Sequence, residues 1–242
     1  MRPSRSLALA LAVTFLAGPV LAQELSFDLG GDGNSLSLRS VQLLLLITVL
    51  SIVPGLAVMV TCFPFIVTVL SILRQAIGLQ QAPPNMLIIS LAMFLTWYVM
   101  DPVFTQAWVT GIEPLTSGRM EVGPALQAAI LPFRDFMALR VDAATFQTLA
   151  DLRPTATTPL AEAPLSLLVP SFLLSEIQRA FEVGFMIFLP FLIIDLVVAA
   201  ILMSMGMMMV PPAVVSLPFK LVFFVVADGW ALVTGALVRS YF

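Results

Sequence analysis

Histidine is absent from this chain of 242 residues, and cysteine occurs once, at Cys62. The lack of histidine removes the commonest general base, Cys/His zinc sites and bis-histidine haem ligation, and a single cysteine forms no internal disulfide. The nucleotide-binding motif G-x-x-x-x-G-K-[ST] does not occur either. We therefore predict that the chain is not an enzyme, has no catalytic or metal-binding residues and holds no cofactor.

Charged residues are also few, with 11 basic and 14 acidic side chains and a formal net charge of −3. The basic residues are scattered singly, which gives no electrostatic footprint for nucleic acid. Hydrophobic residues make up 60% of the chain and its mean hydropathy is +1.06, whereas a soluble domain has about a quarter of its residues charged. This composition predicts a membrane protein, and together with the long apolar runs it predicts an all-α membrane protein.

The N-terminus has the layout of a secretory signal peptide over residues 1–22. Basic residues come first, followed by an apolar run over 7–17 and small residues up to Ala22. The alternative is a first transmembrane helix, but the apolar run is shorter than the roughly 20 residues that a span needs. We expect cleavage between Ala22 and Gln23, which leaves the mature N-terminus outside the cytoplasm.

Four further regions follow the signal peptide. Residues 23–39 are polar and glycine-rich and predict an exposed N-terminal leader. Two strongly apolar regions, 40–100 and 171–242, each predict a hydrophobic helical hairpin. Between them, residues 101–170 hold most of the remaining polar residues and are expected to face outside, with helix around 124–150 and irregular chain after it.

The first hydrophobic region is too long for one straight span. The 34 residues from Ser40 to Leu73 carry no charge and would extend about 51 Å as a helix, against about 30 Å of hydrocarbon core. Pro54 and Pro64 each remove a backbone donor. We expect a kinked or broken segment whose freed carbonyl groups need protein around them.

Six charged side chains lie in the strongly apolar second hairpin. A charge at the centre of a lipid-facing helix costs about 2.5–3.5 kcal/mol, so such residues normally face protein or a cavity. Three of the six have a spacing of three residues, which predicts that the arginine pairs with one of the acids along one helical face. The six are Glu176, Arg179, Glu182, Asp195, Lys220 and Asp228.

The other three charges are placed by counting from the hairpin turn. With Pro211 and Pro212 as the turn, Asp195 and Asp228 lie level, and Lys220 does not reach Asp195 unless a proline breaks the helix. We therefore expect some of these charges to be neutralised between subunits. The alternative is that they lie near helix ends and extend to the membrane interface, which suits Lys220 better than Asp195.

Five methionines fall within seven residues at the same turn. Methionine is unbranched and polarizable, so a ring of such loops from several subunits could close around a passage and reopen for an extended polypeptide. Two alternatives are ordinary hydrophobic filling and a thioether Cu(I) site, although no cysteine or histidine lies nearby. The five are Met203, Met205, Met207, Met208 and Met209.

Two stretches of the sequence resemble the FliP family, the flagellar biosynthetic proteins of the bacterial type III export gate. They are LLVPSFLLSEIQRAFEVGFMIFLPFLIIDLVVAAILMSMGMMMVPPAVVSLPFKLVFFVVADGW, residues 167–230, and VMVTCFPFIVTVLSILRQAIGLQQAPPNMLIISLAMFLTWYVMDPV, residues 58–103. A sister family in virulence injectisomes shares much of the C-terminal pattern. The cleavable leader and the Met-Val-Pro-Pro form of the loop favour the flagellar family.

The resemblance implies a subunit of a channel that conducts unfolded flagellar proteins across the bacterial inner membrane. It implies about five copies assembled helically with FliQ- and FliR-type subunits, beside FlhA- and FlhB-type gate components, in the flagellar basal body. It also implies a core largely on the periplasmic side of the bilayer and a methionine gasket. That gasket would consist of Met205, Met207, Met208 and Met209.

The sequence therefore predicts two long, kinked helical hairpins that bury their polar groups only in a helical or ring-like homo-oligomer. Conduction would be passive, with energy from partner proteins or the proton gradient. One rival function is a small monomeric secondary transporter, with Asp195 and Asp228 in a midplane ion site. A second rival, a membrane enzyme subunit that binds quinone or haem, lacks histidine ligands.

Overall fold

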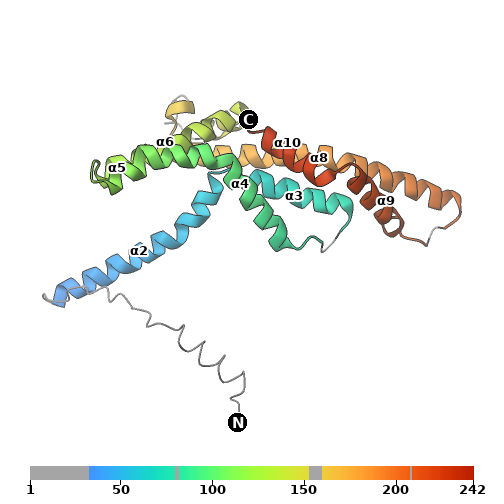
Figure 1. Cartoon of the computed structure of the whole chain (residues 1–242), viewed down its shortest axis with the longest axis horizontal. Helices are drawn as coiled ribbons and strands as arrows, with labels where there is room; N and C mark the ends of the chain where they lie inside the picture. Colours follow the sequence, from blue (N-terminus) through green and yellow to red (C-terminus); the bar gives the residue numbers. More distant parts are fainter. Residues whose placement is uncertain (1–32, 80–81, 153–159, 208) are drawn as a thin grey trace, which may run out of the picture. The chain divides into compact units, whose positions relative to one another are not determined.

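The computed structural model describes residues 33–79, 82–152, 160–207 and 209–242, and all regular secondary structure within them is helical (Figure 1). The predicted all-α class is confirmed. The signal peptide, its cleavage site at Ala22 and Gln23, and residues 23–32 lie outside the described residues. The helices, labelled as in Figure 1, are α2 (Gly33–Met59), α3 (Phe63–Ile77), α4 (Asn85–Ala107), the π-helix η1 (Trp108–Ile112), α5 (Glu113–Thr116), α6 (Val122–Arg140), α7 (Ala143–Asp151), the 3₁₀ turn η2 (Leu160–Glu162), α8 (Leu165–Ser204), α9 (Pro212–Val226) and α10 (Gly229–Arg239).

The chain divides into two compact units, Met1–Leu50 and Ser51–Phe242. In the first, helix α2 exposes Leu44 and Ile47, and none of the described side chains over Ser40–Met59, which extends into the second unit, is buried. A helix that is apolar on all sides needs lipid or other helices around it. This agrees with the membrane character predicted from composition.

In the second unit, the predicted interruption of the first hydrophobic region lies between α2 and α3. Helix α2 runs through Pro54 and ends at Met59, and α3 begins at Phe63 with Pro64 in its first turn. Proline is favoured there because the first helical N–H groups have no intrahelical partner. Pro64 therefore marks the break, and Pro54 does not.

The core of the second unit is built around α3. Its residues Ile66, Val69, Leu70 and Leu73 recur at spacings of three and four and are almost fully buried, which places them on one helical face. This face packs against α8 and α4, and Figure 1 shows α3 lying along α8. The two helices approach closely at Gly184, where an added Cβ would lie 2.4 Å from a side-chain carbon of α3.

The central region is more helical than the sequence suggested. Helix α4 continues through Asp101 and Pro102, so the expected boundary at residue 101 falls inside a helix. The helix predicted around 124–150 is two helices, α6 and α7. Helix α7 begins at Ala143, and the carboxylate of the preceding residue, Asp142, accepts a hydrogen bond of 2.8 Å from the backbone N–H of Thr145. This is the usual way to satisfy a free N–H group at a helix start.

Three described helical stretches are long and apolar enough to span a bilayer: Ser40–Met59, Asn85–Thr116 and Leu165–Ser204. Helices α9 and α10, bent by 62°, would add a fourth as one broken span. The 40 residues of α8 extend about 60 Å, twice the hydrocarbon thickness of about 30 Å. Hydrocarbon therefore cannot surround the whole of an upright α8.

Candidate functional site

The Met loop, residues 205–211, joins α8 to α9. Helix α8 ends in a Schellman motif, in which Met207 N–H donates to the carbonyl of Leu202 (2.9 Å) and Gly206 N–H to that of Met203 (3.1 Å). The motif needs a left-handed residue, and Gly206 supplies it with φ of +73°. The Met-Gly-Met sequence therefore stops α8 at a defined residue and turns the chain toward α9.

The methionine side chains of this loop point away from the core of their own chain. Met205 is 63% exposed, Met207 45% and Met209 98%, and Met203 on the last turn of α8 is 62% exposed. Met208 lies outside the described residues. Ordinary core filling within the chain does not account for the four described methionines, because such filling would bury them.

Farther along the hairpin from the Met loop, helices α3, α8 and α9 meet at a polar contact that we call the Lys220 bridge. It consists of Asp195, Ser216, Lys220 and the backbone carbonyl of Ala76. Lys220 Nζ donates to Asp195 Oδ2 at 2.6 Å and to the Ala76 carbonyl at 3.1 Å. Ser216 Oγ donates to Asp195 Oδ1 at 2.6 Å. The bridge thus joins the end of α3, the second half of α8 and the middle of α9.

The expectation that Lys220 cannot reach Asp195 in an unbroken hairpin is wrong. The turn is the whole Met loop and not the prolines alone, so Asp195 lies nine residues before the last residue of α8 and Lys220 lies eight residues after the first residue of α9. The two side chains are therefore level. Extension of Lys220 to a membrane interface is also excluded, because only 5% of the residue is exposed.

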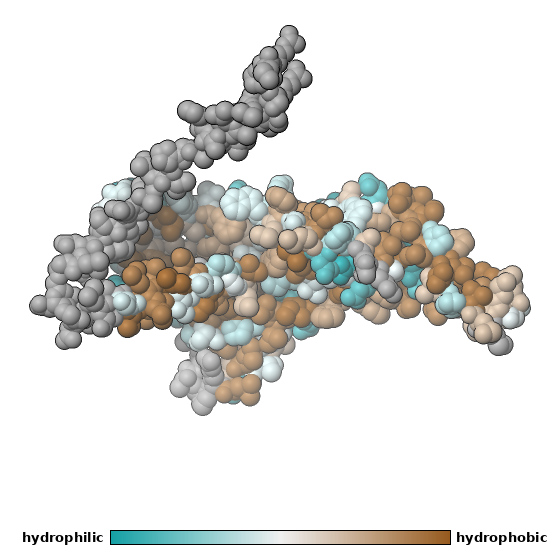
Figure 2. All heavy atoms as spheres, turned by 90° about the horizontal axis from the view of Figure 1, so that it is seen from below, coloured by the Kyte–Doolittle hydropathy of each residue, from teal (hydrophilic) through white to brown (hydrophobic). Residues whose placement is uncertain are grey.

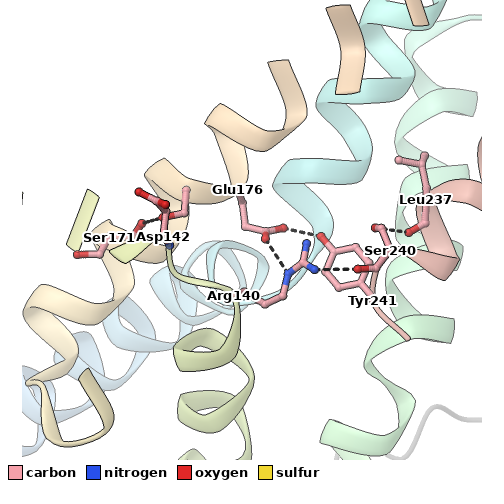
Figure 3. A network of polar contacts seen from close by, with 8 residues as sticks. Arg140, Asp142, Ser171, Glu176, Leu237, Ser240 and Tyr241 are labelled. Atoms are coloured by element: carbon pink, nitrogen blue, oxygen red, sulfur yellow. Dashed lines mark hydrogen bonds and ion pairs between the residues drawn. The ribbon is translucent and has the colours of Figure 1, made fainter. Parts of the chain in front are cut away.

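A second polar group, the Glu176 cluster, lies in the first half of α8 and comprises Arg140, Glu176, Ser240 and Tyr241 (Figure 3). The Glu176 carboxylate is fully buried and accepts hydrogen bonds from Arg140 Nε (3.1 Å) and from the Tyr241 hydroxyl. A buried charge is tolerated when it is paired and hydrogen-bonded. The Glu176 carboxylate meets that requirement within one chain.

Arg140 is itself held on two further sides. Its Nη1 donates to the carbonyl of Ser240 at 2.8 Å, and its guanidinium carbon lies 4.0 Å from the centre of the Tyr241 ring, a cation–π arrangement. Burial, reinforced by the neighbouring Glu176 carboxylate, raises the pKa of Tyr241 well above its usual value. The hydroxyl therefore stays protonated and remains a donor.

The other predicted charges are placed differently. The prediction that Arg179 pairs with Glu176 or Glu182 is wrong: Glu176 turns inward to Arg140 while Arg179 is exposed, and no ion pair of the described residues joins Arg179 to Glu182. Glu182 is also exposed and accepts a hydrogen bond from Gln178, four residues earlier on α8. Asp228 does not lie level with Asp195 across the hairpin, since α9 ends at Val226 and the chain bends by 62° around Asp228.

Three side chains that take part in these groups, Ser216, Arg140 and Tyr241, were not found from the sequence. Ser216 and Lys220 share a helical face at a spacing of four, which could have indicated a common partner. Arg140 and Tyr241 lie 36 residues before and 65 residues after Glu176, and no local pattern links them. Intersubunit neutralisation is not needed for Asp195, Lys220 or Glu176, because each has a partner in its own chain.

Apolar cavities and surfaces accompany these polar groups. A cavity of about 480 Å³ lies against both arms of the α8–α9 hairpin and is lined by Ile194, Val198, Leu202, Val215 and Phe219, among others. Figure 2 shows hydrophobic side chains over much of the surface that it draws, with hydrophilic ones in small groups between them. Surfaces of this kind are covered by lipid or by other protein chains.

Comparison with known proteins gives one consistent result. The model of the FliP family matches residues 46–237. Three similar proteins are each named flagellar biosynthetic protein FliP. The protein of Caulobacter vibrioides is 49% identical over 96% of this chain and 88% of its own length, that of Bacillus subtilis 44% over 84% and 92%, and that of Aquifex aeolicus 41% over 96% and 98%.

Proposed function

The chain belongs to the FliP family of flagellar biosynthetic proteins, and from this premise we propose that it is a pore-forming subunit of the flagellar type III protein export gate. The family consists of structural components of the export apparatus rather than of enzymes. Its members are membrane-embedded flagellar proteins, in agreement with the apolar helices of this chain. The proposed role is passive conduction of unfolded flagellar polypeptides across the inner membrane.

The observation that carries this proposal is the exposed Met loop at the end of a long helical hairpin. Thioether side chains adapt to surfaces that change shape, so several such loops side by side can seal a passage and part for a polypeptide. Met205, Met207, Met208 and Met209 form this gasket in the proposal. Three of them have described side chains, and these are free of their own core.

Assembly supplies the rest of the channel. About five copies associate with FliQ- and FliR-type subunits into a helical or ring-like complex, beside FlhA- and FlhB-type components, with its core on the periplasmic side. Exposed Arg179, Glu182 and Asp228 meet neighbouring subunits, since charges on apolar helices require partners. A cleaved leader over 1–22, an exposed segment over 23–39 and the two hairpins belong to the same proposal.

Replacing Met207, Met208 and Met209 together with alanine tests the gasket. The complex should assemble as in the wild type, while cells that produce it should leak ions and small solutes. The matched control is a triple alanine variant at Met86, Met93 and Met186, which are exposed methionines outside the loop. An unchanged leak in the loop variant, or an equal leak in the control, would remove the gasket from the mechanism.

The rival functions are less well supported. A secondary transporter would need Asp195 free to bind a cation, but the ammonium group of Lys220 already occupies that carboxylate at 2.6 Å. An injectisome subunit would share the fold, yet the similar proteins carry flagellar names. Production of this chain in a flagellar strain that lacks its own family member should restore motility if the chain is a flagellar subunit, and should not if it is an injectisome subunit.

A further inference from the structure

Lys220 is nearly fully buried, yet Asp195 is its only carboxylate partner in the described part of the chain. Its ammonium group lies between Asp195 Oδ2 at 2.6 Å and the Ala76 carbonyl at 3.1 Å. The Asp195 side chain is 31% exposed, whereas that of Lys220 is 7% exposed. The lysine is therefore the member of the pair that is fixed inside the protein, and the contact to α3 is part of what fixes it.

The end of α3 is shaped to receive this ammonium group. The last carbonyl groups of a helix lack intrahelical partners and carry partial negative charge, so a cation is stabilising there. Helix α3 ends at Ile77, and Gly78 follows with φ of +89°. A Cβ at Gly78 would make only ordinary contacts, 4.0 Å from Lys220 Nζ and 3.6 Å from a methyl group of Leu217, so it is the left-handed φ that calls for glycine here.

The position of the Lys220 bridge along the hairpin is what links it to the Met loop. From the bridge, α8 continues nine residues from Asp195 to Ser204, and α9 begins eight residues before Lys220, at Pro212. Each arm is therefore roughly 12–14 Å long. The cavity of about 480 Å³ lies against both arms, so side-chain packing there leaves space. Polar contacts at the bridge fix arms that packing alone holds loosely.

We infer that Lys220 is a positioning residue that holds the Met loop in place by tying the α8–α9 hairpin to the C-terminal end of α3. The inference rests on the proposed gasket function for its consequence, but not for its geometry. Because the ammonium group contacts both α8 and α3, the hairpin cannot shift along α3 without breaking one of the two hydrogen bonds. Displacement of the loop and rupture of the bridge are then one event.

Loop position can be measured directly with a spin label on Met209→Cys, in the Cys62→Ser background, because Met209 is the most exposed of the described loop methionines. In the purified complex, Lys220→Met should raise the population of displaced, mobile loops at least about tenfold, because it leaves Asp195 without its cation. Arg119→Met, which breaks the exposed ion pair with Glu113, is the control and should change nothing.

Two further variants separate the contact to α3 from the ion pair within the hairpin. The double variant Asp195→Lys/Lys220→Asp keeps opposite charges on α8 and α9 but places a carboxylate beside the Ala76 carbonyl. Gly78→Ala keeps the ion pair and disturbs only the end of α3. Both should mobilise the loop. If both show wild-type spectra, the ion pair alone fixes the loop and the tie to α3 is refuted.

The Lys220→Met variant could fail to assemble, and Gly78→Ala then carries the test because it leaves every charge in place. Leak measurements distinguish this inference from the gasket itself. If loop methionine-to-alanine variants leak and the bridge variants do not, the Lys220 inference fails. If the bridge variants mobilise the label but no variant leaks, the gasket fails and the positioning role stands.

Discussion

Replacing Tyr241 with phenylalanine isolates one hydrogen bond of the Glu176 cluster. The variant keeps the ring, which packs edge-on against Phe65 at 5.7 Å and lies over Arg140, but removes the hydroxyl that donates to Glu176. A hydrogen bond to a charged group contributes about 1.5–3 kcal/mol. A chain of this size changes its melting temperature by about 2–4 °C per kcal/mol, so we expect a decrease of about 3–12 °C.

The assay is thermal unfolding of the purified protein in detergent, followed by tryptophan fluorescence. Tyr98→Phe is the matched control, because Tyr98 is the only other tyrosine and is 65% exposed. Its melting temperature should equal that of the wild type. If Tyr241→Phe also melts with the wild type, the hydroxyl does not stabilise the buried carboxylate, and our account of the cluster is wrong.

The same variant gives a pH signature. Burial and the Glu176 carboxylate raise the pKa of Tyr241 above the usual value of 10.0. A raised pKa means that the folded state keeps a proton that the unfolded state loses, so this stabilisation is complete below pH 10 and declines above it. The wild type should lose about 1.4 kcal/mol per pH unit there relative to Tyr241→Phe. A constant difference up to pH 11 would contradict this assignment.

Three other variants or probes test separate features. Asp142→Ala should accelerate hydrogen exchange at the start of α7, because it removes the acceptor for the Thr145 N–H. The hydrogen bonds from Thr145 lower the pKa of Asp142, so the wild type should show the same acceleration only in acid. Equal exchange in both proteins near neutral pH would contradict the cap. Gly206→Ala should cost about 1–2 kcal/mol in thermal unfolding because of its left-handed φ, and Gly123→Ala should cost none. Cys62, 0% exposed, should resist maleimide labelling until the protein is denatured, and rapid labelling of the folded protein would refute its burial.

Local sequence patterns predicted the features that depend on local chemistry. The proline at Pro64 marked the break before α3, and the methionine-rich turn was recognised from five residues within one short segment. Composition indicated a membrane protein, and the long uncharged apolar runs indicated that it is helical. In each case the physical cause, a missing N–H group or a run of apolar side chains, lies within a few residues of its effect.

Long-range partners could not be predicted in the same way. The hairpin count failed because the prolines alone were taken as the turn, and counting from the ends of α8 and α9 instead changes which side chains are level. Glu176 found its partners in α6 and near residue 241, which depends on how α6 and α10 fold back onto α8. Such contacts follow from the tertiary arrangement and leave no periodicity in the sequence.

The folding back of α10 also has a consequence for biosynthesis. Tyr241 is added to the growing chain 65 residues after Glu176, a delay of roughly 3–13 s at typical translation rates. Throughout that interval the carboxylate has Arg140 but neither the tyrosine hydroxyl nor a finished enclosure. A chain shortened before Tyr241 would leave the buried carboxylate with Arg140 alone, so the Glu176 cluster closes only once the segment that follows α10 has folded back onto α8.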